Sequence, residues 1–357
     1  MECPSLDVQA ALALAVRLYG LSGGTAKALD GYDDRNFWLQ NHEVADNPSL
    51  TEVAAAGYTL KVTNSLDSRN LAFLEEQTLL ILHLADHGMN CPRPVRNKDG
   101  KIYSIEQLRE GGPGHAVRLF EFIPGETLGK VPWQPDFADQ AGRELARIHN
   151  VVDGVDFPAV KSRTTEWSLW EAPRVLKYAS YVVDESRRAL VQEVLEAFQR
   201  DTGAQAEFLR GDSGLIHGDF NQFNIVVARA AEGAPSPYSV TGVLDLGDCH
   251  CAPRLFDVAL TAAYMAITSG DVQDIAGVLV GYSRERPLTH VALDLLKVCI
   301  CTRLCQSLVM GLRAHALEPQ NTYVLDTQKN GWPVLQALWK EPKGKYEQEW
   351  KQKVQIA

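Results

Sequence analysis

The spacing of hydrophobic and polar residues changes along the chain, and each change predicts a different type of element. In the first third, stretches such as YTLKVTN alternate apolar and other residues, which is typical of half-buried strands. Apolar residues three and four apart indicate amphipathic helices. The pattern predicts strands within 31–40 and at 58–64, 101–105 and 116–123, and helices at 5–20 and 65–88. This order predicts a small, mainly antiparallel sheet with one helix packed against it.

The remaining two-thirds of the chain carries mainly helical spacing after the turn PGETLG. The segment around Trp167 and Trp170 is predicted to be irregular, and the charged end at 340–357 to be peripheral. Helices are predicted at 137–150, 181–201, 254–267, 272–282, 290–312 and 332–339. The chain is therefore predicted to be an α+β protein with two lobes, residues 1–123 and 124–357.

The segment LIHGDFNQFNIVV places a polar loop between two short apolar runs, which predict buried strands. The loop contains His217, Asp219 and Asn224 but no basic residue. Catalytic groups are often carried by loops between rigid elements, although Asp, Asn and Gly also favour ordinary turns. The segment is therefore a candidate catalytic loop.

The strand after this loop is predicted to form a hairpin with the strand at 240–244 across the loop AAEGAPSP. A register centred on residues 234–235 places Asn224 opposite Asp245, with Asp219 five residues earlier in the chain. Carboxylates brought together without a basic residue repel each other, and a divalent cation would relieve that repulsion. Asn224 and Asp245 supply the oxygen ligands that Mg²⁺ prefers.

The same residues follow the spacing of the protein kinase catalytic loop, H-x-D-x4-N, then a strand, then Asp-x-Gly. Phosphoryl transfer needs a metal and a lysine on the phosphates and a carboxylate at the attacking hydroxyl. Asp219 is the candidate for that carboxylate, and His217 is expected to hold the loop by hydrogen bonds. Asp257 is either a charge at the start of a helix or a buried brace for the loop.

Lys61 lies between apolar neighbours in a predicted strand and is the candidate phosphate lysine, although many strand lysines are simply solvated. The following helix offers Glu75 and Glu76 as its partner. Glu76 shares a helix face with Phe73 and Leu80 and is preferred, although Glu75 shares one with Leu71 and Leu79. The turn GYDDRNF either folds over phosphates, with Asn36 and Arg35 as candidate side-chain donors, or is a plain hairpin turn.

These motifs, together with YTLKV, LFEFIPGETL, GRELARIHN and GVLDLGDCHCAPRLFDVAL, resemble the aminoglycoside phosphotransferase and choline kinase-like family over nearly the whole chain. The resemblance implies a two-lobed protein kinase-like fold and phosphorylation of a hydroxyl group on a small molecule. It also implies a nucleotide between the lobes, with its base against Glu121, Phe122 and Ile123. The resemblance also implies the roles of individual residues. It makes Asp219 the base, Asn224 and Asp245 the Mg²⁺ ligands, Lys61 the phosphate lysine and Glu76 its helix carboxylate.

Stretches outside this core, including GYDDRNFWL, TRLCQSLVMG and NGWPVLQALW, are similar to a subgroup of the family that acts on a hydroxylated amino acid. This implies 5-hydroxy-L-lysine as acceptor and GTP as donor, in lysine breakdown, although spacing does not distinguish GTP from ATP. Two alternatives stay open. The acceptor is another hydroxyl compound, such as choline, homoserine or an aminoglycoside, or the protein is a non-catalytic nucleotide-binding scaffold. Asp248, Arg303 and Trp332 are acceptor-site candidates, and each is equally explained as a surface or packing residue.

The composition of the chain limits the classes of partner and the cellular location that we expect. The net charge is −10 and no Lys/Arg cluster occurs, which argues against nucleic acid. No apolar stretch approaches the ~18 residues of a membrane span, and the N-terminus has neither a signal-peptide nor a presequence pattern. An odd number of cysteines, seven, favours reduced thiols in the cytoplasm. Cys249-His250-Cys251 lacks a second ligand pair, so packing is preferred to a metal site. A monomer is the default expectation.

Overall fold

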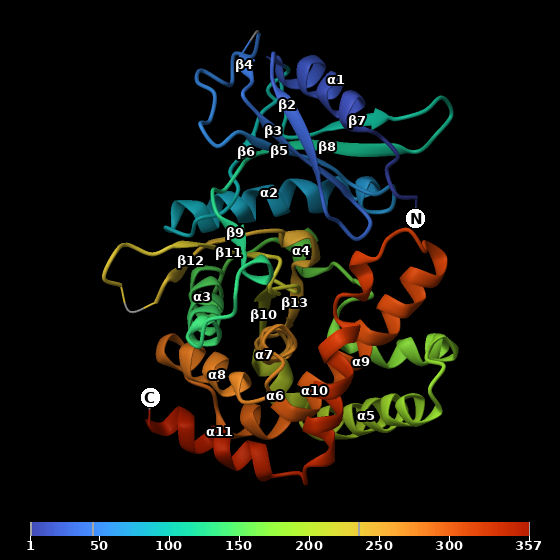
Figure 1. The fold of residues 1–357 in the computed structure, drawn as a ribbon, viewed down its shortest axis with the longest axis vertical. Helices are drawn as coiled ribbons and strands as arrows, with labels where there is room; N and C mark the ends of the chain where they lie inside the picture. The colour runs from blue at the N-terminus through green and yellow to red at the C-terminus, as the bar shows by residue number, and fades with distance from the viewer. Residues whose placement is uncertain (1, 45, 235, 357) are drawn as a thin grey trace. The chain divides into compact units, whose positions relative to one another are not determined.

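The computed structural model describes residues 2–44, 46–234 and 236–356. Its contacts divide the chain into two compact units, Met1–Pro124 and Gly125–Ala357. Figure 1 labels most of the helices and strands of both units. The first unit contains the β-sheet predicted for the first third of the chain, and the second is mostly helical.

The main sheet of the first unit has the strand order β2-β3-β5-β8-β6, with β7 also paired with β8, and all of its pairs are antiparallel. The predicted strands are present, and short strands that the pattern did not predict are added to them. The strands are β2 (Thr25–Leu29), β3 (Arg35–Gln40), β5 (Tyr58–Val62), β6 (Pro94–Val95), β7 (Ser104–Gln107) and β8 (Gly114–Glu121), with a separate pair of β1 (Leu21–Ser22) and β4 (Glu43–Val44).

The two helices of this unit cover opposite faces of the sheet (Figure 1). Alternation in β5 turns Tyr58, Leu60 and Val62 into the core under α1 (Val8–Tyr19). Lys61 therefore lies on the other face, towards α2 (Leu71–Asp86). The helix predicted at 65–88 is α2 preceded by a separate 3₁₀ turn, η1 (Asp67–Arg69).

The second unit contains a three-stranded sheet of order β12-β11-β9 and a separate pair of β10 and β13. Its strands are β9 (Glu126–Thr127), β10 (Ser213–Ile216), β11 (Ile225–Arg229), β12 (Tyr238–Val243) and β13 (His250–Pro253). Its α-helices are α3 (Phe137–Val151), α4 (Pro158–Lys161), α5 (Glu185–Ala204), α6 (Ala206–Gly211), α7 (Arg254–Ser269), α8 (Asp274–Glu285), α9 (His290–Leu317), α10 (Gln328–Lys340) and α11 (Lys345–Ile356). Its 3₁₀ segments are η2 (Leu128–Lys130), η3 (Leu169–Tyr181), η4 (Leu246–Asp248) and η5 (Tyr323–Leu325).

Helix α9 is the central helix of this unit. By length and composition it is the one helix among the described residues that could cross a membrane, so the expectation of no such apolar stretch was wrong. However, 94% of its most apolar window is buried inside the protein, where it packs against α5, α7, α10 and η3. Burial against other helices on every side accounts for its hydrophobicity.

The charged C-terminal segment is a packed helix, which corrects the prediction that it is peripheral. Tyr346 and Trp350 lie four residues apart on one face of α11, and their rings stack at a centroid distance of 5.6 Å. Trp350 is only 1% exposed, and α11 packs against α8 and α9. The many Lys and Glu residues made the segment look solvent-exposed in the sequence, but its narrow apolar stripe is enough to pack the helix against the rest of the unit.

The predicted hairpin of β11 and β12 forms, but its register was wrong. Thr241 is an extra residue in β12, which shifts the pairing partway along the hairpin. Asn224 lies opposite Leu244, whose N–H donates to the Asn224 carbonyl at 2.8 Å, and the predicted partner Asp245 follows one residue later. Pro235, at the centre of the predicted turn, lies outside the described residues.

Candidate active site

The loop between β10 and β11 is held in place by a buried carboxylate. Asp257, in the first turn of α7, accepts hydrogen bonds from the N–H groups of His217 (2.8 Å) and Gly218 (2.9 Å). His149 of α3 approaches the same carboxylate at 3.1 Å. Burial would raise the pKa of Asp257, but His149 and the loop hydrogen bonds hold that pKa below its ordinary value. Of the two interpretations of Asp257, the contacts favour the buried brace.

Gly218 allows the chain to bend at this point. Its φ is +80°, and a Cβ at this position would lie 2.2 Å from the carbonyl oxygen of Asp248. An L-residue is excluded by both the backbone conformation and the contact. The glycine of the HGD motif is therefore required by the shape of the loop.

His217 ties the loop to the end of β12. Its Nε2 lies 2.9 Å from the carbonyl oxygen of Leu244, and its Nδ1 lies 3.3 Å from the backbone nitrogen of Asp219. The arrangement needs a neutral ring that donates from Nε2 and accepts at Nδ1. Burial lowers the pKa of His217, which favours this neutral form.

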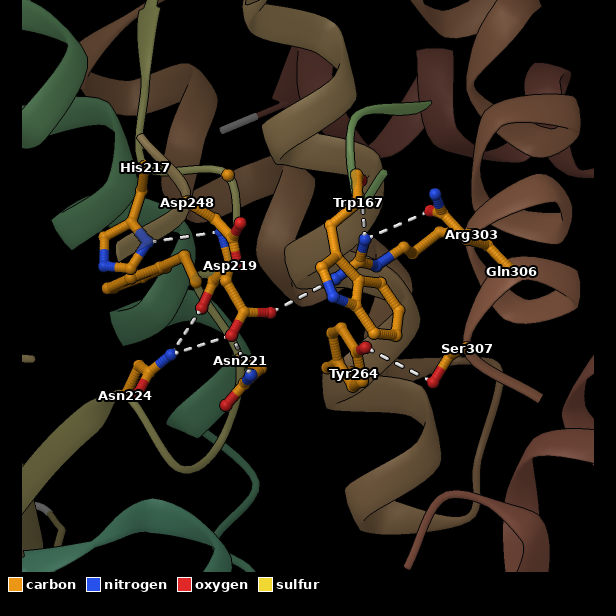
Figure 2. Close-up of polar contacts among 12 residues, drawn as sticks. Trp167, His217, Asp219, Asn221, Asn224, Asp248, Tyr264, Arg303, Gln306 and Ser307 are labelled. Carbon is orange, nitrogen blue, oxygen red and sulfur yellow. Dashed lines mark hydrogen bonds and ion pairs between the residues drawn. The ribbon is translucent and has the colours of Figure 1, made fainter. Parts of the chain in front are cut away.

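Both carboxylate oxygens of Asp219 are held in place, as Figure 2 shows. Oδ1 accepts from Arg303 at 3.1 Å, and Oδ2 accepts from the side-chain amides of Asn221 (2.9 Å) and Asn224 (3.1 Å). The side chain still keeps 27% of its surface exposed. Burial raises the pKa of Asp219 to about 7, against the lowering effect of Arg303. A fixed, reachable carboxylate of this kind can orient a hydroxyl group and accept its proton.

Arg303 is the basic residue that the loop sequence does not contain. It extends from α9, is 2% exposed, and lies over the rings of Trp167 (5.0 Å) and Tyr264 (5.4 Å). Its Nη1 donates to the carbonyl of Trp167 at 3.0 Å and to Gln306 at 3.1 Å. The expectation that no basic residue meets these carboxylates was therefore wrong. An arginine inside the apolar run CICTRLCQSL was the sequence signal, because a buried charge needs a partner.

Asn224 and Asp245 fit the chemistry of a magnesium site. The Asn224 amide nitrogen donates to Asp219, so its oxygen is turned away from that hydrogen bond. Asp245 is exposed, has a left-handed φ of 50°, and accepts from the N–H of Gly247 at 2.9 Å. No group of three or more His, Cys, Asp or Glu side chains in the described part of the chain could hold a metal. An ion with one carboxylate and one amide ligand needs further oxygen ligands, which Mg²⁺ commonly takes from substrate phosphates.

In the first unit, Lys61 and Asn36 are directly paired across strands β5 and β3. The Lys61 ammonium lies 3.1 Å from Asp34, a contact that the sequence did not indicate. Glu76 is half-buried on α2, whereas Glu75 is exposed and accepts from the hydroxyl of Tyr103 at 3.2 Å. These positions favour Glu76 over Glu75, and its pairing with Lys61 stays a prediction.

The segment predicted to face a nucleotide base begins at Glu121, the last residue of β8. The N–H of Glu121 donates to the Arg93 carbonyl at 2.8 Å, and the Phe122 ring stacks on Trp38 with centroids 4.4 Å apart. Ile123 is buried. The backbone of this segment is thus fixed, and its contact with a base stays a prediction.

The three acceptor-site candidates have different surroundings. Asp248 is half-buried, accepts from the Thr165 hydroxyl at 3.0 Å, and acts electrostatically on Asp219. Arg303 is buried and forms an ion pair with Asp219. Trp332 is buried, with Arg187 over its ring and its indole N–H donating to Gln328 at 3.0 Å. Of the three, Asp248 combines partial exposure with proximity to Asp219, and Trp332 is a packing residue.

Comparison with known proteins places this geometry in a family. Residues 25–290 match the model of the phosphotransferase enzyme family. The chain is 30% identical to a hydroxylysine kinase of Xenopus laevis over 97% of this chain and 93% of the relative. It is 29% identical to a hydroxylysine kinase of Danio rerio over 99% and 97%. A solved structure of a microcompartment-associated aminopropanol kinase matches with a TM-score of 0.70 at 19% identity, over 94% of this chain and 98% of that one.

These matches agree with the arrangement of the loop. The family model includes Lys61, the catalytic-loop candidates and Asp257. The structural match supports the predicted protein kinase-like fold, with an antiparallel sheet in one unit and helices in the other. The chain belongs to the phosphotransferase enzyme family and is a small-molecule kinase.

Proposed function

We propose that the protein transfers the γ-phosphate of GTP to the hydroxyl group of 5-hydroxy-L-lysine, giving 5-phosphohydroxylysine and GDP in lysine degradation. The observation that carries the proposal is the fixed carboxylate of Asp219, in a chain similar to hydroxylysine kinases over nearly its whole length. GTP as the donor rests on that similarity.

In the proposed reaction, the groups that act on the acceptor come from the second unit. The acceptor oxygen forms a bond to the γ-phosphorus while the bond from that phosphorus to the β–γ bridging oxygen breaks. Asp219 accepts the hydroxyl proton, and GDP leaves. Arg303, Asn221 and Asn224 keep the carboxylate in one orientation throughout, which lowers the entropic cost of alignment.

The donor phosphates need positive charge, and we propose two sources. Lys61 in the first unit contacts the phosphates, and Asn36 across from it is a further donor. Asn224 and Asp245 would hold Mg²⁺, which reduces the charge of the phosphates when it is bound. The base is proposed to contact the segment from Glu121 to Ile123.

The charges around Asp219 favour an acceptor that carries ammonium groups. Burial is the main cause of the raised pKa of Asp219; the negative charges of Asp248 and Asp245 raise that pKa further, and Arg303 lowers it. The carboxylates therefore outnumber the guanidinium. Hydroxylysine carries two ammonium groups and one carboxylate, so we propose that Asp248 binds one of those ammonium groups.

The test is a coupled assay of nucleoside diphosphate release, with GTP and ATP in separate reactions containing Mg²⁺. 5-Hydroxylysine is the expected acceptor, lysine is the matched control without the hydroxyl, and choline and homoserine test other acceptors. Release with hydroxylysine and GTP, but not with lysine, supports the proposal. Release only with another hydroxyl compound, or only with ATP, would replace the proposed substrates while the family assignment stands.

Binding of nucleotide without transfer to any acceptor would instead favour a non-catalytic scaffold.

We also propose a cytoplasmic location, with nucleotide and a small molecule as partners and a monomer as the default state. Buried thiols support a reducing compartment. Cys299, Cys301 and Cys305 of α9 are such thiols, and burial raises the pKa of Cys301 to about 12.

A further inference from the structure

The candidate phosphate lysine is paired with a carboxylate from the neighbouring turn. Asp34 lies between β2 and β3, and its Oδ2 is 3.1 Å from the ammonium nitrogen of Lys61. The two side chains are only 14% and 13% exposed, respectively. An ion pair that is this well shielded is stronger than a solvated surface pair. The contact therefore bears directly on any other anion that binds Lys61.

Asp34 is held in this position by Asn64, which lies two residues after the end of β5. Its second oxygen accepts from the backbone N–H of Asn64 at 2.8 Å and from the Asn64 side-chain amide at 3.2 Å. Asn64 is itself buried, and its own oxygen accepts from the N–H groups of Leu66 and Asp67. The carboxylate of Asp34 is thus fixed by hydrogen bonds to the segment that follows β5.

Two more carboxylates surround the same amide. The Asn64 side-chain nitrogen lies 2.9 Å from Asp67 and 3.4 Å from Asp33. The lysine thus lies at the edge of a group of negative charges. A nucleoside triphosphate adds several more negative charges, and like charges about 4 Å apart repel by about 1 kcal/mol even in water, and by more where they are shielded.

We propose that Asp34 is an internal competitor of the donor phosphates for Lys61, and that its carboxylate sets the affinity of the enzyme for its phosphate donor. The inference rests on the proposed function, in which Lys61 binds those phosphates. Donor binding moves the Lys61 ammonium from Asp34 to the phosphates, and this exchange weakens the net affinity. A donor enters with lower affinity than the same site would give without the Asp34 charge.

The experiment compares the wild-type protein with Asp34→Asn. Asparagine keeps the shape and an oxygen for the Asn64 N–H, and it removes the negative charge. Calorimetric titration with Mg-GTP is expected to give a dissociation constant lower by a factor of about five or more, from the Coulomb energy of a single contact. The kcat for hydroxylysine is measured in parallel.

Three comparisons make the result specific. Asp99→Asn removes one charge from an exposed turn of the same unit and is expected to change the dissociation constant by less than about two-fold, because distant exposed charges are screened. Guanosine, which has no phosphate, is expected to bind both proteins equally. Asp34→Ser, which also keeps an oxygen, replaces Asp34→Asn if the latter does not fold.

Each other outcome overturns the inference. If the Asp34 variants bind Mg-GTP equally well or more weakly than the wild-type protein, Asp34 does not compete with the phosphates for Lys61. A lower kcat without tighter binding shows that Asp34 positions Lys61 for transfer. An equal gain for guanosine shows a change in the base site. If the wild-type protein binds neither Mg-GTP nor Mg-ATP, the proposed function fails and the inference fails with it, which is a distinct result.

Discussion

Replacing Arg303 by methionine removes the guanidinium that pairs with Asp219 and keeps the unbranched apolar stem of the side chain. The wild-type guanidinium makes hydrogen bonds to Asp219, to the Trp167 carbonyl and to Gln306, from a side chain that is 2% exposed. Removing one partner of a buried pair typically costs about 3–5 kcal/mol. Water can partly solvate the remaining carboxylate, because Asp219 is 27% exposed, so we expect a loss near the lower end, about 3 kcal/mol.

Activity should fall for a related reason. Without Arg303, Oδ1 of Asp219 loses its fixed donor and the carboxylate can rotate, and small misplacements of a reacting group cost up to roughly 100-fold in rate. The assays are urea denaturation and kcat with saturating substrates. Arg313→Met is the matched control, since Arg313 lies on the same helix and contacts the ring of Tyr178 at 4.2 Å. A loss below about 1 kcal/mol for Arg303→Met, with wild-type kcat, would refute the reasoning.

Four further predictions follow from individual contacts. Asp219→Asn should abolish transfer and leave the Mg-GTP affinity within about two-fold, measured by calorimetry. EDTA should abolish transfer, and added Mg²⁺ should restore it. The folded-state pKa of Asp257 is held below its ordinary value by His149 and the loop N–H groups despite burial. Its stabilisation is therefore present above about pH 4 and lost as the pH falls through the folded-state value, so acid unfolding of Asp257→Asn should depend less on pH. Trp350→Ala should cost about 3–5 kcal/mol in thermal or urea unfolding, and a cost near zero would return α11 to the periphery.

The sequence predicted the features that depend on residues close together in the chain. The strand β5, the catalytic loop and the hairpin after it follow from local alternation and from the spacing of His217, Asp219 and Asn224. Such patterns are set by the two-residue and 3.6-residue repeats of strands and helices, and a single chain displays them directly.

The partners that complete the site come from distant parts of the chain, and spacing does not reveal them. Arg303 is 84 residues from Asp219, and His149 is 108 residues from Asp257. The hairpin register differed from the prediction because strand alternation does not fix the centre of a polar loop, and the extra residue at Thr241 leaves no signal in an alternating pattern. The contact of Asp34 with Lys61 depends on how a polar turn folds back, which composition does not specify.

Mass spectrometry of the acceptor, after incubation with Mg-GTP, measures the central claim most directly. The wild-type protein should convert 5-hydroxylysine to a phosphate ester and leave lysine unchanged, and Asp219→Asn should form no ester. An ester formed equally well by Asp219→Asn, or a phosphate attached to lysine, would contradict the assignment of Asp219 as the group that activates the acceptor hydroxyl.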